Sequence, residues 1–327
     1  MKLFILILYF IFFTPSFLLA SKVPHVIIFE TMTLKIIQEK TDGLISYMEE
    51  KGFINGKTIK LHRINAQKNR NLGKKLLKET ILKYPPTLVI TNATMASQIA
   101  KEELEGTNIP LFFLGVTDPV RAGIVKKIGV THKNLVTGSI HTVSSNTIFN
   151  IVLKILSTGP VIKPYKIGLI YSSYPSSYNN FKELQNISRN TDIQFVPIQV
   201  KNINDLQYSL KTTTEKFDFI WLTPSPFAIS DEFVQHLMDI TTKPIIFIEK
   251  MSYVKKGVLL AIDINSTIYG REAGEMVVSL LNGVSITDME VRRSKKFELG
   301  INIKTANKMN VVIPSDILDL AKRNLFK

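Results

Sequence analysis

Short apolar runs alternate with helical patterns along this chain, and the whole alternation occurs twice. A short apolar run bounded by polar residues is typical of a strand buried on both faces, as in a parallel sheet. Strands separated by helices predict right-handed crossovers. The sequence therefore predicts an α/β fold with two Rossmann-like lobes, whose strands are HVIIFE (25–30), TIKLHRI (58–64), TLVIT (87–91) and LFFLGV (111–116), then KIGLIY (166–171), QFVPIQV (194–200), FDFIWL (217–222) and PIIFIE (244–249).

The expected helices of the first half span residues 33–51, 68–84 and 93–104. Two later segments show apolar residues at helical spacing, which predicts that each lays an apolar stripe on a sheet. These residues are Ile229, Phe233, Leu237 and Ile240 in one segment and Ala273, Met276, Val277 and Leu280 in the other. Two lobes also suit the 327-residue length, because single cores stop growing at about 250 to 300 residues.

The N-terminus resembles a secretory signal peptide. Lys2 precedes an apolar core over residues 3–13, and a break at Thr14, Pro15 and Ser16 leads to Ala20, after which we expect cleavage. A retained anchor is the alternative, but the break leaves the apolar run shorter than the roughly 20 residues of a spanning helix. We expect a periplasmic or otherwise extracytoplasmic protein. The chain has no Cys, so it forms no disulfide and carries no lipid on an N-terminal Cys.

The formal charge is +14, but the basic residues do not form a nucleic-acid platform. They are scattered over segments such as 68–83 and 292–296, without the interleaved aromatic residues that stack on bases. We expect no nucleic-acid partner, while a loose attraction to an anionic membrane surface stays open.

Catalytic and metal signatures are missing from the sequence. It has no Cys nucleophile, no G-x-S-x-G, no G-x-x-x-x-G-K and no G-x-G-x-x-G after a strand. Its five His residues show no metal-ligand spacing. The sequence predicts neither an enzyme nor a bound metal or cofactor.

Small polar residues and acids follow the predicted strands. Ligands of open α/β sheets bind at the carboxyl ends of the strands, so these residues are candidates for a ligand site. In the first lobe they are Glu30, Thr31, Asn92, Thr94, Thr117 and Asp118, and in the second Tyr171, Ser173, Asn180, Thr223 and Glu249.

Two of these candidates have specific expected roles. Thr94 and the amides of the helix that it begins suit a carboxylate on the positive end of the helix dipole, although an ordinary helix cap is the alternative. Asp118 suits an ammonium, or it caps the turn that Pro119 starts.

Several ordered motifs resemble those of a known family. Residues 116–125 (VTDPVRAGIV) and 134–138 (NLVTG) look like the VTDPVxAGLV and NVTG motifs of ABC-transporter substrate-binding proteins, a group of type I periplasmic binding proteins with tryptophan- and tyrosine-binding members. Residues 270–283 and 299–314 resemble the family's late helix and closing segment. The resemblance covers nearly the whole chain after the signal segment.

The resemblance implies a type I periplasmic binding protein fold with three crossings between the lobes. We place them near residues 138–142, 261–265 and 282–289, with Gly138, Gly257 and Gly283 near the junctions. The first lobe then contains residues 21–140 and 265–285, and the second 141–264 and 286–327.

Two departures from the family pattern touch the expected site. The first strand often ends in Glu-His in this family, whereas Glu30 is followed by Thr31. The usual polar, Asp-containing loop after the third strand of the second lobe is replaced by TPSP (223–226). Both changes bear on which ligand binds.

The resemblance implies a monomeric binding protein that captures a small polar ligand, with an amino acid, aromatic or other, as the first expectation, and delivers it to a membrane permease. A sugar- or nucleoside-binding protein of the same fold is the first alternative. A ligand-sensing accessory protein that reports to a membrane partner is the second.

Overall fold

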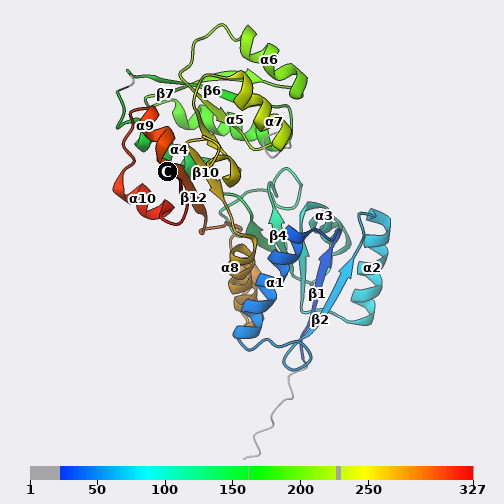
Figure 1. The fold of residues 1–327 in the computed structure, drawn as a ribbon. Coiled ribbons are helices and arrows are strands. Elements are labelled where there is room, and N and C mark those ends of the chain that lie inside the picture. The colour runs from blue at the N-terminus through cyan, green and yellow to red at the C-terminus, as the bar shows by residue number, and fades with distance from the viewer. Residues whose placement is uncertain (1–22, 161, 226–229, 327) are drawn as a thin grey trace, which may run out of the picture.

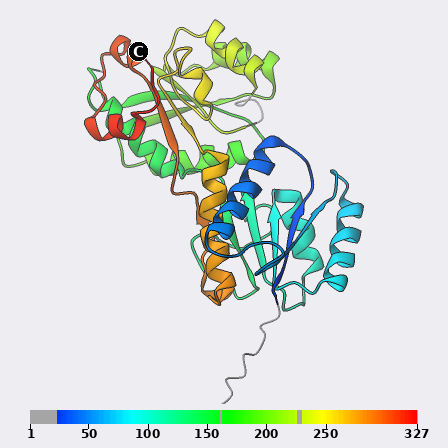
Figure 2. The ribbon, with the colours of Figure 1, turned by 60° about the horizontal axis from the view of Figure 1, so that its bottom comes forward.

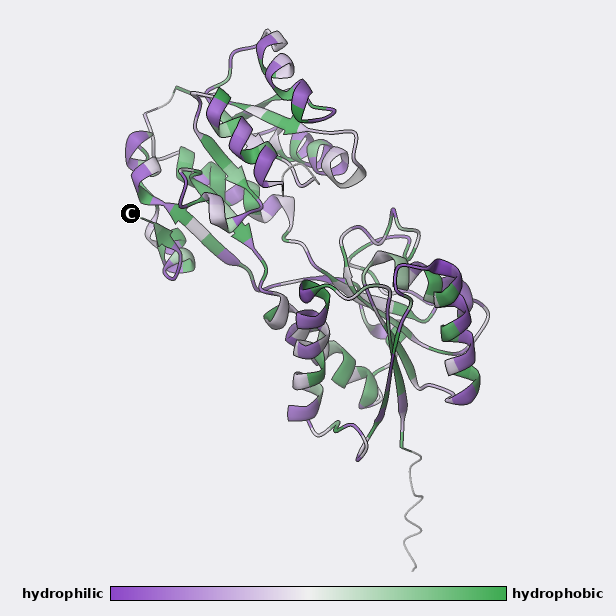
Figure 3. Ribbon diagram, turned by 45° about the vertical axis from the view of Figure 1, so that its right-hand side comes forward, coloured by the Kyte–Doolittle hydropathy of each residue, from purple (hydrophilic) through white to green (hydrophobic). Residues whose placement is uncertain are grey.

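The computed structural model describes residues 23–160, 162–225 and 230–326, so the signal segment lies outside the described residues, as do Ile229 and the last residue of the 223–226 segment. The chain forms two α/β lobes joined by narrow connections (Figure 1). Most of the strands are apolar runs that are buried between helices, and the hydropathy colours of Figure 3 follow the same pattern.

The first lobe has a six-stranded parallel sheet in the order β11-β5-β4-β3-β1-β2. Helices α1 and α8 cover one face, and α2 and α3 cover the other (Figures 1 and 2). Its elements are β1 (His25–Glu30), α1 (Lys35–Glu50), β2 (Lys60–Asn65), α2 (Arg70–Lys83), β3 (Leu88–Asn92), α3 (Thr94–Glu103), β4 (Leu111–Val116), β5 (Val136–Ile140), α8 (Ser266–Leu281), the 3₁₀ turn η2 (Ile286–Asp288) and β11 (Arg292–Arg293).

The second lobe has a seven-stranded sheet in the order β13-β12-β10-β9-β8-β6-β7. Its elements are α4 (Ser145–Leu156), β6 (Tyr165–Tyr171), α5 (Pro175–Ser188), β7 (Ile193–Gln199), α6 (Ile203–Thr212), β8 (Phe219–Leu222), α7 (Asp231–Ile240), β9 (Ile245–Ile248), the 3₁₀ turn η1 (Met251–Tyr253), β10 (Leu260–Asp263), β12 (Glu298–Asn302), α9 (Ile303–Lys308), α10 (Ser315–Ala321) and β13 (Leu325–Phe326).

One strand of the second lobe runs against its neighbour. β10 leads toward the first lobe and β12 returns from it, so the two pair antiparallel, from Leu260 opposite Ile301 to Asp263 opposite Glu298. The other pairs in this sheet are parallel, as the alternation of strands and helices predicts.

The chain crosses between the lobes at residues 141–144, 264–265 and 294–297. The prediction for the third crossing is wrong, because β11 pairs with β5 in the first lobe and Met289 packs into the first-lobe core. A two-residue Arg-Arg strand carries no apolar run, so the sequence gives no sign of it. Gly138 lies inside β5 rather than at a junction. A glycine is needed there because a Cβ would lie 2.3 Å from the Phe113 carbonyl oxygen.

Candidate functional site at the facing edges of the lobes

The crossings leave the carboxyl ends of β5 and β10, so these ends of the two sheets face each other. We use the term interlobe edge for the end of each sheet at which its parallel strands finish. Among the described residues, one hydrogen bond spans the two edges at this point, from Asn179 Nδ2 on α5 to Asp118 Oδ2 after β4, at 3.0 Å. Residues at both edges therefore lie within reach of one small molecule.

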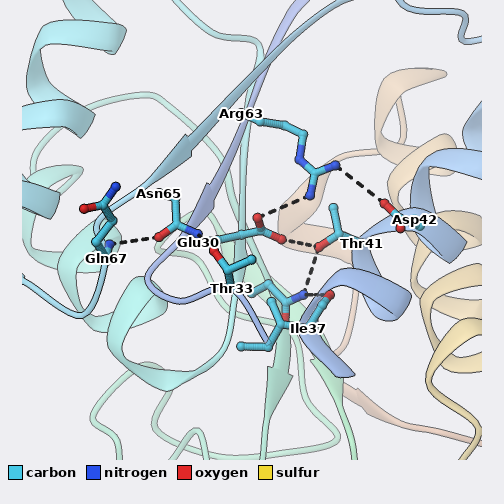
Figure 4. Close-up of polar contacts among 9 residues, drawn as sticks. Glu30, Thr33, Ile37, Thr41, Asp42, Arg63, Asn65 and Gln67 are labelled. Carbon is cyan, nitrogen blue, oxygen red and sulfur yellow. Dashed lines mark hydrogen bonds and ion pairs between the residues drawn. The ribbon is translucent and has the colours of Figure 1, made fainter. Parts of the chain in front are cut away.

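Glu30 ends β1 with both carboxylate oxygens occupied. Its Oε1 accepts a 2.6 Å hydrogen bond from Thr41 on α1, and its Oε2 accepts a 3.3 Å bond from Arg63 on β2 (Figure 4). Arg63 also pairs with Asp42 at 3.5 Å. Glu30 is buried, and its contacts hold α1 against the sheet.

Asn92 ends β3 with its amide orientation fixed by its partners. Its Nδ2 donates to the Ile37 carbonyl and to Thr41 Oγ1, each at 2.9 Å, so both N–H groups are used. Its Oδ1 is buried and has no hydrogen-bond partner among the described residues. The buried Thr31 hydroxyl after β1 likewise has none in that part of the chain.

Helix α3 begins at Thr94 without a side-chain cap. The residue before it, Ala93, has a φ of 78°, and no side chain accepts from the amides of the first turn. Thr94 is exposed at this end. The uncapped amides thus face the interlobe edge.

Asp118 serves both its own turn and the second lobe. Its Oδ1 accepts from the Arg121 amide at 3.0 Å, while its Oδ2 accepts the bond from Asn179. The neighbouring Thr117 is exposed. The turn-capping interpretation of Asp118 is therefore seen in the structure, together with an interlobe contact that the sequence does not suggest.

The second-lobe candidates divide into exposed and buried groups. Tyr171 is half-buried and stacks on Phe181 with 3.9 Å between ring centroids, and burial and then Tyr178 raise the pKa of its hydroxyl. Ser173 is exposed. Thr223 is fully buried, and its hydroxyl bonds the Ile170 carbonyl at 3.1 Å and Ser177 at 2.6 Å.

Two further candidates of this lobe lie beside crossings. Asn180 donates to Ser145 at the start of α4, while its Oδ1 is buried and has no partner among the described residues. Glu249 is half-buried after β9, and burial followed by the charge of Asp263 raises its pKa to about 7.

Three residues near the first and second crossings escaped the sequence analysis. The Tyr269 hydroxyl on α8 donates to the Ser139 carbonyl at 2.5 Å and accepts from the Gly115 amide at 2.9 Å. The His141 ring lies edge-on to Tyr269 at 4.6 Å, and Lys40 Nζ lies 5.7 Å from the centre of the Tyr269 ring.

Burial dominates the electrostatics of this group. It lowers the pKa of Lys40 to about 8, and together with the charge of Lys40 it lowers the pKa of His141 to about 3. One sequence signal could have revealed Lys40. It and Thr41 occupy the turn between Ile37 and Leu44, on the buried stripe of α1.

Two negative findings apply to the described residues. No group of three or more His, Cys, Asp or Glu side chains within them is placed to hold a metal ion. None of the helices within those ranges is long and apolar enough to cross a membrane.

The family model for ABC transporter substrate binding proteins matches residues 26–325. The chain belongs to this family. Among curated proteins, a tyrosine-binding protein of Clostridioides difficile (strain R20291) is 26% identical over 271 residues, which cover 82% of this chain and 76% of the relative.

Solved structures agree on the fold of this substrate-binding protein. The ligand-free, open structure of a substrate-binding protein with adhesive properties from Clostridium difficile has a TM-score of 0.71 at 22% identity, covering 93% of this chain and 99% of the other. An ABC domain from Streptococcus pneumonia in complex with L-Trp has a TM-score of 0.60 at 20% identity, covering 93% and 100%. The fold is that of type I periplasmic binding proteins.

Family membership establishes a binding protein rather than an enzyme. Substrate-binding proteins of ABC transporters work outside the cytoplasm, take a small-molecule ligand and serve a membrane permease. The ligand of this member is the open question.

Proposed function

We propose that this substrate-binding protein captures an amino acid, preferably an aromatic one, between its lobes and delivers it to a membrane permease. The observation that carries the proposal is the pairing of a polar first-lobe edge with aromatic side chains on the second. The Asn179 to Asp118 bond brings the two together, and the exposed rings of Tyr174 and Tyr178 lie on either side of α5's first turn. The name of the tyrosine-binding relative supports the same ligand class.

The ligand binds by closure of the lobes over it. Thr94, Thr117 and the uncapped amides of α3 offer donors on the first lobe, while Ser173 and Asn180 offer polar groups on the second. A ligand ring against Tyr171 and its neighbours adds about 25 cal/mol for each Å² of apolar surface buried. Closure excludes water, which strengthens every polar contact inside. The proposed signal segment, residues 1–20, is removed on export.

A ligand panel tests the proposal. We expect L-tyrosine or L-tryptophan to give heat in calorimetric titrations of residues 21–327 and to raise the midpoint of thermal unfolding. Ligand at a hundred times its Kd stabilises the folded state by about 2.7 kcal/mol. Glucose, galactose and uridine serve as controls.

Each outcome has a clear meaning. Heat with a sugar or nucleoside and none with amino acids would replace this proposal with the sugar-binding alternative. No heat and no thermal shift with any of the twenty amino acids would reject the proposal.

A further inference from the structure

One buried hydroxyl of the first lobe bonds the backbone of two neighbouring strands. Tyr269 on α8 is fully buried, and its hydroxyl donates to the Ser139 carbonyl on β5 at 2.5 Å and accepts from the Gly115 amide on β4 at 2.9 Å. Burial raises the pKa of this hydroxyl well above its usual range, so it keeps the proton that it donates. A tyrosine hydroxyl carries one proton, so each of the two bonds has a fixed direction.

The Gly115 amide reaches this hydroxyl because β4 is irregular at that point. The register with β5 shifts between Leu114 and Val116, and Gly115 has a φ of +68°, a conformation that favours glycine. An amide that a bulge takes out of the ladder needs another acceptor, and the Tyr269 hydroxyl is that acceptor. The hydroxyl thus fixes the end of β4.

The segments that meet at Tyr269 lead to the facing edges of the lobes. β4 leads to Asp118, whose carboxylate accepts the 3.0 Å bond from Asn179 of the second lobe. β5 ends at the first crossing, where the His141 ring lies edge-on to the Tyr269 ring. α8 begins directly after the second crossing, residues 264–265. One side chain therefore contacts the strand that bears the interlobe bond and the segments next to two crossings.

We propose that Tyr269 is a positioning residue for closure of the lobes. Its hydroxyl joins the end of β4, the end of β5 and the start of α8 into one rigid unit, so Asp118 meets the second lobe at an angle that the crossings set. Without these bonds the bulge at Gly115 moves relative to the crossings, and the lobes meet in a wider range of orientations. The inference needs only the two-lobed fold and holds whichever ligand the protein takes.

A second buried tyrosine offers a matched control. Tyr253 is also fully buried, and its hydroxyl donates to Asp231, at 2.6 Å to Oδ1 and 2.9 Å to the carbonyl oxygen. Asp231 lies on α7, so these bonds stay within the second lobe. Tyr253→Phe and Tyr269→Phe each remove one hydroxyl with two partners and keep the ring. Only Tyr269→Phe releases segments that lead to the crossings.

The first test measures the distance between the lobes by double electron-electron resonance. The chain has no Cys, so Lys75→Cys on α2 and Lys211→Cys on α6 place one spin label at an exposed position of each lobe. We expect Tyr269→Phe to widen the distribution of label distances in the ligand-free protein and Tyr253→Phe to leave it unchanged. The midpoint of thermal unfolding should fall by a few degrees in both variants. An unchanged distribution in Tyr269→Phe, or equal widening in the two variants, would overturn the proposal.

The second test leaves Tyr269 in place, so it decides the matter even if Tyr269→Phe does not fold. Amide hydrogen exchange followed by NMR compares Gly115 with Val89, a buried residue of β3 whose amide donates to the Pro110 carbonyl. Strand ends usually open locally, and their amides then exchange faster than those of the core. Held by Tyr269, the Gly115 amide should exchange as slowly as that of Val89. Exchange at Gly115 that is faster by about tenfold or more would show that this end of β4 opens by itself and would overturn the proposal.

Discussion

At the scale of single residues, the first lobe retains a cation that opposes its own folding. Taking the Lys40 ammonium out of water favours its neutral form, which is why its pKa falls from 10.5 to about 8. The described neighbours supply a ring face but no carboxylate in return. The burial of this ammonium therefore costs the folded protein stability.

Lys40→Met should therefore stabilise the ligand-free protein at pH 7 by roughly 3 kcal/mol, since the pKa falls from 10.5 to about 8 and one pKa unit corresponds to about 1.4 kcal/mol. Below pH 8 both the folded and the unfolded wild type hold this proton, so the full cost is present. Between about pH 8 and pH 10.5 the folded state has lost a proton that the unfolded chain still holds, so wild-type stability rises with pH.

Urea unfolding at pH 7 and pH 10 measures the effect. The advantage of Lys40→Met over the wild type should shrink at pH 10. Lys35→Met removes a charge from an exposed side chain of the same helix, so it should stay close to the wild type at both values. A difference that is the same at the two pH values would contradict burial of an unpaired ammonium at this site.

At the scale of elements, the contact between α1 and α8 positions Lys40. These helices approach so closely that a Cβ at Gly270 would lie 2.0 Å from the Lys40 carbonyl oxygen, and one at Gly43 would lie 2.3 Å from the Thr267 carbonyl oxygen. The backbone of Lys40 is thus pressed against α8, and its side chain extends along the Tyr269 ring toward β4.

Gly270→Ala should separate the helices and destabilise the fold by about 2 kcal/mol or more, since overpacking in a tight contact typically costs 1 to 3 kcal/mol. Glu275→Ala, at an exposed position of α8, is the control and should change stability by less than about 0.5 kcal/mol. Thermal unfolding measures both variants, and an unperturbed Gly270→Ala would show that the helices are not in such close contact.

Elements that bury apolar runs were predictable, and those fixed by contacts between distant segments were not. The strand from Leu111 to Val116 is readable because a strand that is buried on both faces is a nearly continuous apolar run, and the structure places it at those bounds. β11 is two arginines at a sheet edge, so no hydrophobic pattern marks it. The orphaned Oδ1 of Asn92 depends on Ile37 and Thr41, more than fifty residues away, and no spacing rule reports such a contact.

The same reasoning explains the mixed fate of the candidate site residues. The strand ends locate the interlobe edge in the sequence. They do not show which of its side chains form hydrogen bonds within the lobe and are therefore not available to a ligand. The polar atoms of Glu30 and Thr223 form hydrogen bonds to neighbouring elements, whereas Thr94, Thr117 and Ser173 remain exposed.

At the scale of the whole molecule, function depends on how far the lobes close. A ligand shifts the balance between open and closed forms only by its differential affinity for the closed one. The Asn179 to Asp118 bond is a contact that closure makes without a ligand, and an exposed hydrogen bond of this kind contributes about 0.5 to 1.5 kcal/mol. A bond of this strength favours the closed form but does not hold the protein in it.

Two variants separate closure from ligand contact at this bond. Asn179→Ala removes the interlobe bond and keeps the Asp118 carboxylate, so it should weaken L-tyrosine binding by only about two- to tenfold. Asp118→Ala removes the bond and any contact of the carboxylate with the ligand, and it should abolish binding without unfolding the chain. Small-angle X-ray scattering should show a smaller radius of gyration for the wild type when L-tyrosine is added, a shift that needs more ligand in Asn179→Ala. Equal losses of affinity in the two variants would assign Asp118 to its turn and to the interlobe bond alone, and an unchanged radius of gyration in saturating L-tyrosine would mean that the lobes do not close on it.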